Sequence, residues 1–142
     1  MIELAANLCV LHPQLIGHVW PRVTPFLEAA FQHPVDEPEM TIEDARHRVE
    51  IGAVHLLYAK RGNGEITGAG LVEIIRYPRF TAAHVIALGG GGILDPWLRE
   101  QFKQWAASHG ATKMQAVYRP EVARLFRACG MKSVAVFGRG DL

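Results

Sequence analysis

Four consecutive glycines constrain the fold of this chain more than any other feature of its sequence: Gly89, Gly90, Gly91 and Gly92. An apolar stretch with the pattern of a short strand, Ala82–Leu88, precedes them, and a helix begins after them at Asp95 and Pro96. Because glycine has no side chain, a ligand can approach the backbone N–H groups of this stretch closely. The start of the helix adds unpaired N–H donors and the positive end of the helix dipole. The stretch therefore predicts a phosphate site; a flexible connection between two elements is the alternative.

Two well-known phosphate motifs do not fit this stretch. A dinucleotide-binding fingerprint that starts at Gly89 requires glycine where Leu94 stands, and one that starts at Gly90 requires glycine or alanine where Asp95 stands. A P-loop requires Gly-Lys-Ser/Thr at the start of the helix, where this chain has Leu94, Asp95 and Pro96. The glycine loop belongs to neither class.

The chain has the size and composition of one soluble globular domain, residues 1–142. Hydrophobic residues make up 49% of it and charged residues 20%, and its net charge is +1. No apolar run is long enough to span a membrane, so neither membrane association nor secretion is expected. Nucleic acid binding is not expected either, because the basic residues near the end are not expected to have exposed aromatic residues interleaved with them and are interpreted as a solvated face: Arg119, Arg124, Arg127, Lys132 and Arg139.

The cysteines and histidines do not indicate a metal site. Cys9 and Cys129 lie at opposite ends of the chain, and neither has a nearby cysteine or histidine at the spacing of metal ligands. We expect both thiols to act as small buried hydrophobic groups. The seven histidines are scattered without an HExxH motif, so no metal is expected.

The first part of the chain predicts one strand and two helices in succession. Ile2–Val10 is apolar enough for a strand, and a helix begins near His12 and Pro13. Pro21 is expected to interrupt this helix. Thr24 and Pro25 then have the pattern of an N-cap followed by proline at the first helical position, which predicts a second piece of helix.

An exposed loop and a short capped helix come next. His33–Met40 carries two prolines and three acidic residues and is predicted to be a loop. Thr41–Asp44 resembles a capping box and predicts a helix that continues to about Glu50.

Three antiparallel strands are predicted before the glycines. Ala53–Lys60 and Glu65–Arg76 are joined by Asn63-Gly64, a strong hairpin signal because both residues tolerate positive φ. Tyr77–Arg79 forms a second turn, which leads to a strand that begins near Phe80.

The remaining chain alternates helix and strand. The helix that begins at Asp95 ends before Gly110, and the strand Thr112–Tyr118 after it is expected to be parallel to its neighbour because a helical crossover precedes it. A helix from Pro120, with Val122, Leu125, Phe126 and Cys129 facing inward, and a last strand, Met131–Phe137, complete the chain. The predicted fold class is α+β, with a mixed, mostly antiparallel sheet of about six to seven strands flanked by helices.

This order of elements resembles the GNAT superfamily of acyl-CoA-dependent N-acyltransferases. The likeness covers almost the whole chain and is most specific from Val85 to Phe137. Trp105-Ala106 followed by His109-Gly110-Ala111 resembles the third helix of the family and its Gly-Ala exit, and Leu125–Met131 resembles its closing Leu-Tyr-x-x-x-Gly-Phe element. A weaker likeness to a small branch carried by tailed bacteriophages rests on three short segments: Val19-Trp20-Pro21, Tyr77-Pro78-Arg79 and Leu88-Gly89-Gly90.

The resemblance implies acetyl-CoA as co-substrate and a site for it. The glycines and the helix at Asp95 would receive the pyrophosphate of coenzyme A. The edge of the strand through Ile86 and Leu88 would pair with the pantetheine arm. This strand and Lys113–Tyr118 would splay apart around that arm, while an amine would approach over the helices of Leu11–Gly52. The cofactor-binding residues implied are Ile86, Leu88, Gly89, Gly90, Gly91 and Gly92.

The chemistry requires a base for the ammonium group, donors for an oxyanion, and an acid for the departing thiolate. Backbone N–H groups near Ile86 are the candidate donors. Glu73 and His84 are the candidate bases, with a solvated strand residue and a core histidine as the respective alternatives. Tyr118 is the candidate acid; packing of its ring against the sheet is the alternative.

Departures from the family pattern define a second interpretation. Glycine replaces the usual basic residue of the pyrophosphate loop, Asp95 stands where the anionic charge would lie, and Phe126 replaces the tyrosine acid. Arg119 stands where an asparagine often does. The alternative is therefore a non-catalytic GNAT-fold protein, such as a phage virion component or an accessory protein. An enzyme would use a small-molecule or protein amine in the cytoplasm; a structural protein would have protein partners or form a homo-oligomer, in the host cytoplasm or the virion.

Overall fold

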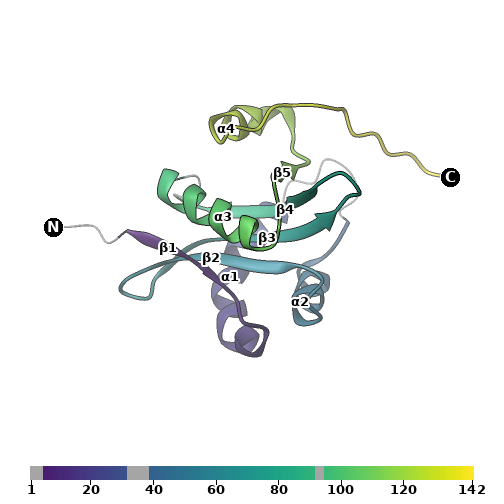
Figure 1. The fold of residues 1–142 in the computed structure, drawn as a ribbon. Helices are drawn as coiled ribbons and strands as arrows, with labels where there is room; N and C mark the ends of the chain where they lie inside the picture. Colours follow the sequence, from purple (N-terminus) through teal and green to yellow (C-terminus); the bar gives the residue numbers. More distant parts are fainter. Residues whose placement is uncertain (1–4, 32–38, 92–94) are drawn as a thin grey trace.

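The computed structural model describes residues 5–31, 39–91 and 95–142 and places a mixed sheet at the centre of the molecule (Figure 1). In this part of the chain the sheet has five strands: β1 (Ala6–Val10), β2 (His55–Arg61), β3 (Ile66–Arg76), β4 (Thr81–Gly90) and β5 (Lys113–Ala116). They lie in sequence order, and all neighbours are antiparallel except β4 and β5, which are parallel. The fold class is confirmed, with fewer strands than the predicted six to seven.

Helices cover both faces of the sheet (Figure 1). They are α1 (Ile16–Phe31), α2 (Ile42–Glu50), α3 (Pro96–Ser108) and α4 (Ala123–Ala128), with short 3-10 turns at Pro13–Leu15 and Pro120–Val122. The helices α1 and α2 lie on one face, and α3 and α4 lie on the other. None of the helices in the described ranges has the length and apolar character needed to cross a membrane.

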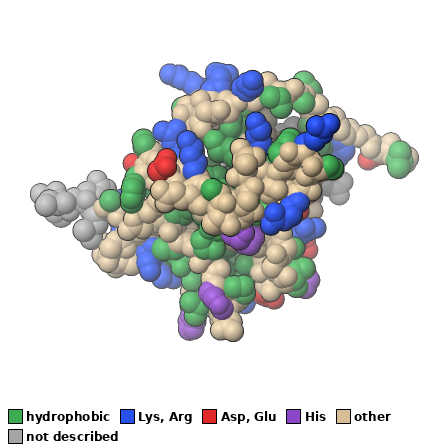
Figure 2. Space-filling model, in the orientation of Figure 1, with side chains coloured by type: hydrophobic (Ala, Val, Ile, Leu, Met, Phe, Trp, Pro, Cys, Tyr) green, Lys and Arg blue, Asp and Glu red, His purple; other side chains and the backbone are tan. Residues whose placement is uncertain are grey.

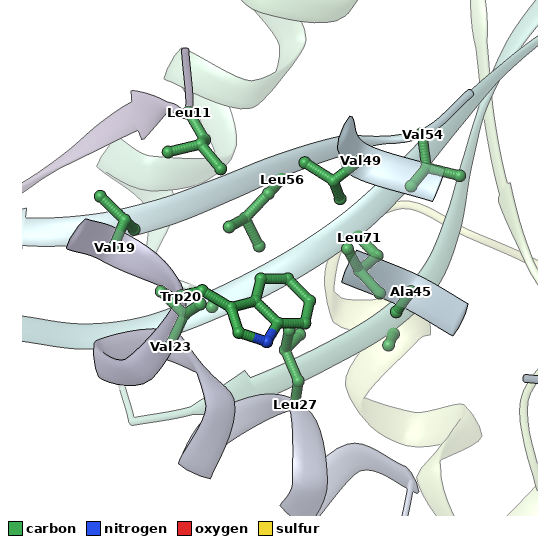
Figure 3. Packing of buried hydrophobic residues seen from close by; sticks show 12 residues of the cluster. Leu11, Val19, Trp20, Val23, Leu27, Ala45, Val49, Val54, Leu56 and Leu71 are labelled. Atoms are coloured by element: carbon green, nitrogen blue, oxygen red, sulfur yellow. The ribbon is translucent and has the colours of Figure 1, made fainter. Parts of the chain in front are cut away.

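The main hydrophobic core lies between the sheet and the first two helices. Figure 3 shows Trp20 and Leu27 of α1 directed toward Leu56 and Leu71 of the sheet. Complete burial of one such side chain stabilises the fold by about 1.5–3 kcal/mol. A smaller cluster under α3 contains Leu57, Val72, Ala83 and Ala106. Both faces of the sheet are therefore covered, and this fixes the faces on which its other side chains lie.

The predicted break of the first helix at Pro21 is wrong. The helix α1 is continuous and contains both Pro21 and Pro25. Thr24 is not an N-cap, since its hydroxyl donates to the carbonyl oxygen of Trp20 at 2.6 Å. Each proline in a helix interior costs about 3 kcal/mol. Burial of the stripe that includes Trp20 and Leu27 offsets this cost.

Two local predictions about turns and caps are confirmed. At the start of α2, the Thr41 hydroxyl accepts from the Asp44 N–H at 3.1 Å, and the Asp44 carboxylate accepts from the Thr41 N–H at 2.9 Å. The hairpin between β2 and β3 turns at Asn63 and Gly64, although only Gly64 has positive φ, at 89°. Residues 2–4 of the predicted first strand and 33–38 of the predicted loop lie outside the described residues.

The predicted last strand, Met131–Phe137, is wrong. The segment has no regular structure, and Val134 and Val136 are 82% and 98% exposed. Leu125 of α4, predicted to face inward, is exposed as well. Alternating valines favour an extended backbone, but a strand also requires a neighbouring strand to accept its hydrogen bonds. The segment instead runs away from α4 as an extended trace (Figure 1).

Two of the four glycines belong to the sheet rather than to a loop. Gly89 and Gly90 are residues of β4 and pair with Ala69 and Gly68 of β3. A Cβ atom on Gly89 would lie 2.1 Å from the carbonyl oxygen of Phe26 in α1, and one on Gly90 would lie 2.4 Å from the Cα of Gly68. Their lack of a side chain is therefore required by the close approach of α1 and β3 to β4.

A matched pair of substitutions tests this packing role. We expect Gly89→Ala to lower the free energy of unfolding by about 1–3 kcal/mol, because the new methyl group must displace backbone atoms of α1. Gly91→Ala is the control, since a Cβ at Gly91 has no atom within 4 Å. It should change stability by less than about 1 kcal/mol. Urea unfolding measures both values, and equal stability of the two variants would contradict the packing explanation.

Candidate active site

The pairing of β4 with β5 ends near the point where the two strands were predicted to splay apart. Their parallel pairing joins Ala82–Val85 to Lys113–Ala116 and ends there. The strand β4 continues to Gly90, and over this length it pairs only with β3 among the described strands. On its outer edge, Ile86–Gly90 is therefore paired with no other described strand. The predicted site for an extended ligand requires an unpaired edge of this kind.

Ile86 forms a bulge in β4 beside this divergence. In the register with β3, Leu71 is opposite Ala87 and Val72 is opposite Val85, so Ile86 has no partner residue. Ile86 and Ala87 both pack against the core beneath α1, whereas Val85 lines a pocket on the other face. An extra residue in one strand leaves its backbone groups out of the regular ladder. The role of the N–H near Ile86 as an oxyanion donor stays a prediction.

The two candidate bases lie side by side on the sheet. Glu73 of β3 is directly opposite His84 of β4, and His84 is opposite Gln115 of β5. The Nε2 atom of Gln115 lies 3.1 Å from His84 Nδ1 and 3.0 Å from the Tyr77 hydroxyl. These four side chains form one polar group at the point where β4 and β5 begin to diverge. Sequence analysis named two of them.

Partial burial lowers the pKa of the His84 imidazole from its ordinary value of 6.5. The carboxylate of Glu73 opposes this shift, and its effect is smaller than that of burial. The imidazole is therefore neutral at pH 7 and able to accept a proton.

Tyr118 lies away from this polar group. Its ring stacks on Phe126 of α4 with the centroids 4.4 Å apart, and its hydroxyl lies 3.3 Å from the Ser133 hydroxyl. The structure thus places Tyr118 beside α4, beyond the end of β5 at Ala116. Its role as an acid for the thiolate stays a prediction.

Gln115 and Tyr77 were missed by sequence analysis for a physical reason. Gln115 reaches His84 only through the register between β4 and β5, and Tyr77 reaches Gln115 from the turn before β4. A parallel register is not fixed by a hairpin turn, so no spacing in the sequence reports it.

Hydrogen bonds join the first turns of α3 to β1. Asp95 is the N-cap, as predicted, and accepts from the Trp97 N–H at 2.8 Å. The Trp97 indole N–H donates to Asn7 Oδ1 at 3.1 Å, and the Leu8 N–H donates to Gln101 Oε1 at 2.8 Å. A phosphate at this helix would therefore meet a carboxylate that already uses one of the free N–H groups.

The four glycines do not share one role. A Cβ on Gly91 would have no described atom within 4 Å, whereas Gly89 and Gly90 are packed in the sheet, and Gly92 lies outside the described residues. Gly89 and Gly90 therefore have a packing role, since their Cα atoms abut α1 and β3, and the phosphate site at the four glycines stays a prediction.

An apolar pocket of about 100 Å³ lies between the sheet and the helices α3 and α4. Val85 and Leu88 of β4 line it from the sheet, Phe102 lines it from α3, and Cys129 lines it from just after α4. The described residues contain no group of three or more His, Cys, Asp or Glu side chains placed to hold a metal ion.

Solved structures share this fold across nearly the whole chain. An aminoglycoside acetyltransferase from an uncultured soil metagenomic sample, in complex with sisomicin, is 11% identical with a TM-score of 0.68, covering 96% of each chain. Glucosamine-6-phosphate N-acetyltransferase from Arabidopsis thaliana is 17% identical with a TM-score of 0.59, covering 96% of this chain and 97% of that one. Ribosomal-protein-alanine N-acetyltransferase from Brucella melitensis biovar Abortus 2308 is 18% identical with a TM-score of 0.64, covering 97% and 99%.

These neighbours show that the chain has the GNAT fold. No protein-family model and no curated protein sequence matches the chain. The likeness is therefore one of structure at low sequence identity.

The lowered histidine pKa values predict a loss of stability in acid. Burial lowers the pKa of His84 and of His55, which also lies beside His109. Below pH 6.5 the unfolded chain binds more protons at these positions than the folded chain does. The free energy of unfolding, fully present above pH 6.5, should therefore fall as the pH drops toward 5. Urea unfolding at pH 7, 6 and 5 measures this slope.

Substitutions identify which histidines cause the fall in the free energy of unfolding at low pH. His84→Gln should make the loss of stability between pH 7 and pH 5 shallower. His18→Gln, at an exposed histidine of α1, is the control and should leave the slope unchanged. An unaltered slope in His84→Gln would exclude His84 as one of its sources.

Proposed function

We propose that the chain is a GNAT-type N-acyltransferase that transfers an acyl group, with acetyl as the reference case, from coenzyme A to an amine. The observation that carries this proposal is the unpaired edge of β4 beyond Val85, with the Ile86 bulge beside His84. This places an extended binding edge, an unpaired backbone position and a neutral imidazole next to one another. N-acyl transfer requires these three features together.

The donor would bind along the divergence of the two strands. The pantetheine arm, which carries amides, is proposed to pair with the outer edge of β4 between Ile86 and Leu88. The pyrophosphate would lie near Gly91 and Gly92 at the start of α3, where helical N–H groups favour an anion. The Asp95 carboxylate weakens this site by its charge.

Each catalytic role has one proposed residue. His84 Nε2 takes a proton from the ammonium group of the acceptor, the N–H near Ile86 donates to the carbonyl oxygen that gains charge, and Tyr118 returns a proton to the departing sulfur. A free Nε2 requires the proton on Nδ1. The structure has the amide nitrogen of Gln115 facing Nδ1, so this role requires the carboxamide turned over, with its oxygen accepting from the Nδ1–H. Glu73, opposite His84, is the alternative base.

The acceptor is proposed to be an amine that approaches over α1 and α2. Glu73 and His84 share a face of the sheet with Leu71, whose side chain packs beneath these helices. The three solved neighbours are named for an aminoglycoside, glucosamine-6-phosphate and the alanine of a ribosomal protein, which are chemically unlike apart from an amino group. The likeness to these neighbours therefore supports only that the acceptor carries an amino group.

A non-catalytic GNAT-fold protein, such as a virion component of the phage-carried branch or an accessory protein, is the second candidate. Three observations favour it. The Asp95 carboxylate occupies an N–H group at the start of α3, and Gly89 and Gly90 are packed against α1 and β3. In addition, Phe126 stacks on Tyr118 at the position of the family's tyrosine acid. Such a protein would bind a protein partner or a second copy instead of coenzyme A.

Calorimetry with acetyl-CoA separates the two candidates. We expect micromolar binding to the wild type, loss of binding in Gly91→Asp, and about two- to fivefold tighter binding in Asp95→Asn, because asparagine still caps the helix without the repulsive charge. Asp141→Asn removes the same charge from the C-terminal segment and should have no effect. Absence of binding at millimolar acetyl-CoA, in both the wild type and Asp95→Asn, would refute the enzyme proposal and favour the second candidate.

Steady-state acetyl transfer to a panel of amines tests the proposed base. We expect His84→Gln to lower kcat by about 10²- to 10⁴-fold, because it removes the group that accepts the proton. His55→Gln is the matched control, since His55 is also partly buried with a lowered pKa but lies beside Trp105 under α3. It should keep the wild-type kcat. An active His84→Gln together with an inactive Glu73→Gln would move the role of base to Glu73.

A further inference from the structure

Two histidine side chains lie against each other at the end of α3. His55 is the first residue of β2, and His109 is the C-cap of α3. Their ring centroids are 5.0 Å apart, and the indole of Trp105 lies 5.3 Å from the ring of His55 and 4.9 Å from that of His109. The packing of α3 on the sheet brings the two histidines together, although they are far apart in the sequence. For this reason their spacing in the sequence did not predict the pair.

The ring nitrogens of this pair are available to a ligand. Both side chains are partly exposed, and neither imidazole makes a hydrogen bond or an ion pair with another described residue. Among the described side chains that are not exposed, the one polar atom that is both buried and unpartnered is Arg99 Nε, so the nitrogens of His55 and His109 reach solvent. Figure 2 shows histidine atoms (purple) at the surface near the end of α3.

The separation of the two rings fits two ligands of one metal ion. A zinc ion lies about 2.0–2.1 Å from a ligating imidazole nitrogen and therefore about 3.2 Å from the centroid of that ring. Two imidazoles at a nearly tetrahedral angle around the ion then have their centroids about 5 Å apart. The rings of His55 and His109 have this separation.

The charge of the surroundings partly favours a cation. Burial and, to a smaller extent, the neighbouring His109 lower the pKa of His55 from its ordinary value of 6.5. The His55 imidazole is therefore neutral at pH 7, which is the form that binds a metal. The last carbonyl groups of α3 place partial negative charge beside His109. The guanidinium of Arg76 lies near Gly110 and opposes this effect.

We propose that His55 and His109 form a binding site for a divalent transition-metal ion whose remaining ligands are water molecules. Imidazole nitrogen is a preferred ligand of the ions from Ni²⁺ to Zn²⁺, whereas Mg²⁺ and Ca²⁺ prefer oxygen, so the site selects the former. The described residues supply no third His, Cys, Asp or Glu ligand, and the site therefore binds more weakly than a closed structural site.

The bound ion links the start of β2 to the end of α3 and stabilises their packing. This link lies in the core layer beneath α3, which contains Trp105 and Leu57, whereas His84 lies on the other face of the sheet. The ion thus takes no part in the proposed acyl transfer, and the inference does not rest on that function.

Titration of the protein with Ni²⁺, followed by tryptophan fluorescence, tests the inference. A bound Ni²⁺ ion quenches an indole that touches its ligands, and Trp105 is one of three tryptophans in the chain. We expect a saturable loss of emission at micromolar Ni²⁺ that EDTA reverses, and no loss with Mg²⁺. Calorimetry measures the same affinity without relying on the indole. Trp105→Phe should therefore abolish the quenching and retain the heat of binding.

Substitutions of the two ligands make the test specific. Loss of a residue that merely supports a ligand typically weakens metal binding by about 10- to 100-fold, so His55→Gln and His109→Gln should each weaken Ni²⁺ binding at least about tenfold. His18→Gln, at an exposed histidine of α1, is the matched control and should bind as the wild type does. Circular dichroism checks that each variant is folded, and either ligand variant suffices if the other is not.

The alternative is that the two rings only pack on Trp105. This alternative predicts no saturable binding of Ni²⁺ to the wild type, or wild-type affinity in a folded His55→Gln or His109→Gln variant, and either result would overturn the inference. Ni²⁺ should also raise the urea midpoint of the wild type, because it binds the folded chain, and should not raise that of the ligand variants. An equal rise in all of them would place the ion elsewhere and overturn the inference as well.

Discussion

One extra residue in β4 determines how the two faces of this sheet are used. Without the bulge at Ile86, Leu88 would lie on the same face as His84. With it, Ile86 and Ala87 both pack beneath α1, and Leu88 is returned to the face covered by α3. The polar group around His84 and the apolar pocket beside Leu88 thereby come to lie on opposite faces at the same point of the strand. A bulge beside a functional site commonly has this effect of re-aiming side chains.

Local signals in the sequence predicted most of the elements. The capping box at Thr41, the N-cap at Asp95 and the glycine end of α3 at Gly110 rely on side-chain and backbone chemistry within a few residues, and the structure has all three. The parallel pairing of β4 and β5 was also predictable, since a helical crossover allows it. The candidate bases Glu73 and His84 were named, but their direct opposition was not.

Failures of prediction arose where distant contacts decide the outcome. Pro21 does not break α1 because its neighbours are buried against a sheet that is formed much later in the chain. The valines of Met131–Phe137 indicate a strand, yet strand formation depends on a partner edge that no local pattern reveals. For Gly89, the sequence alone cannot distinguish two reasons for the missing side chain. It allows either a ligand to approach a loop or a helix to pack closely on a strand. Proximity of Phe26, more than sixty positions away, settles that choice.

The arrangement of the candidate site would separate the two proposed substrates by face. The candidate base, His84, lies on the face of α1 and α2, whereas the apolar pocket and the basic residues of α3 that line it lie on the opposite face. At Ile86 the outer edge of β4 pairs with no other described strand, and this edge lies between the two faces of the sheet. An amine and an acyl donor that approach from opposite sides can therefore meet there without competing for the same space. The weak point of the proposed arrangement is electrostatic, because the Asp95 carboxylate at the start of α3 would repel a phosphate bound there.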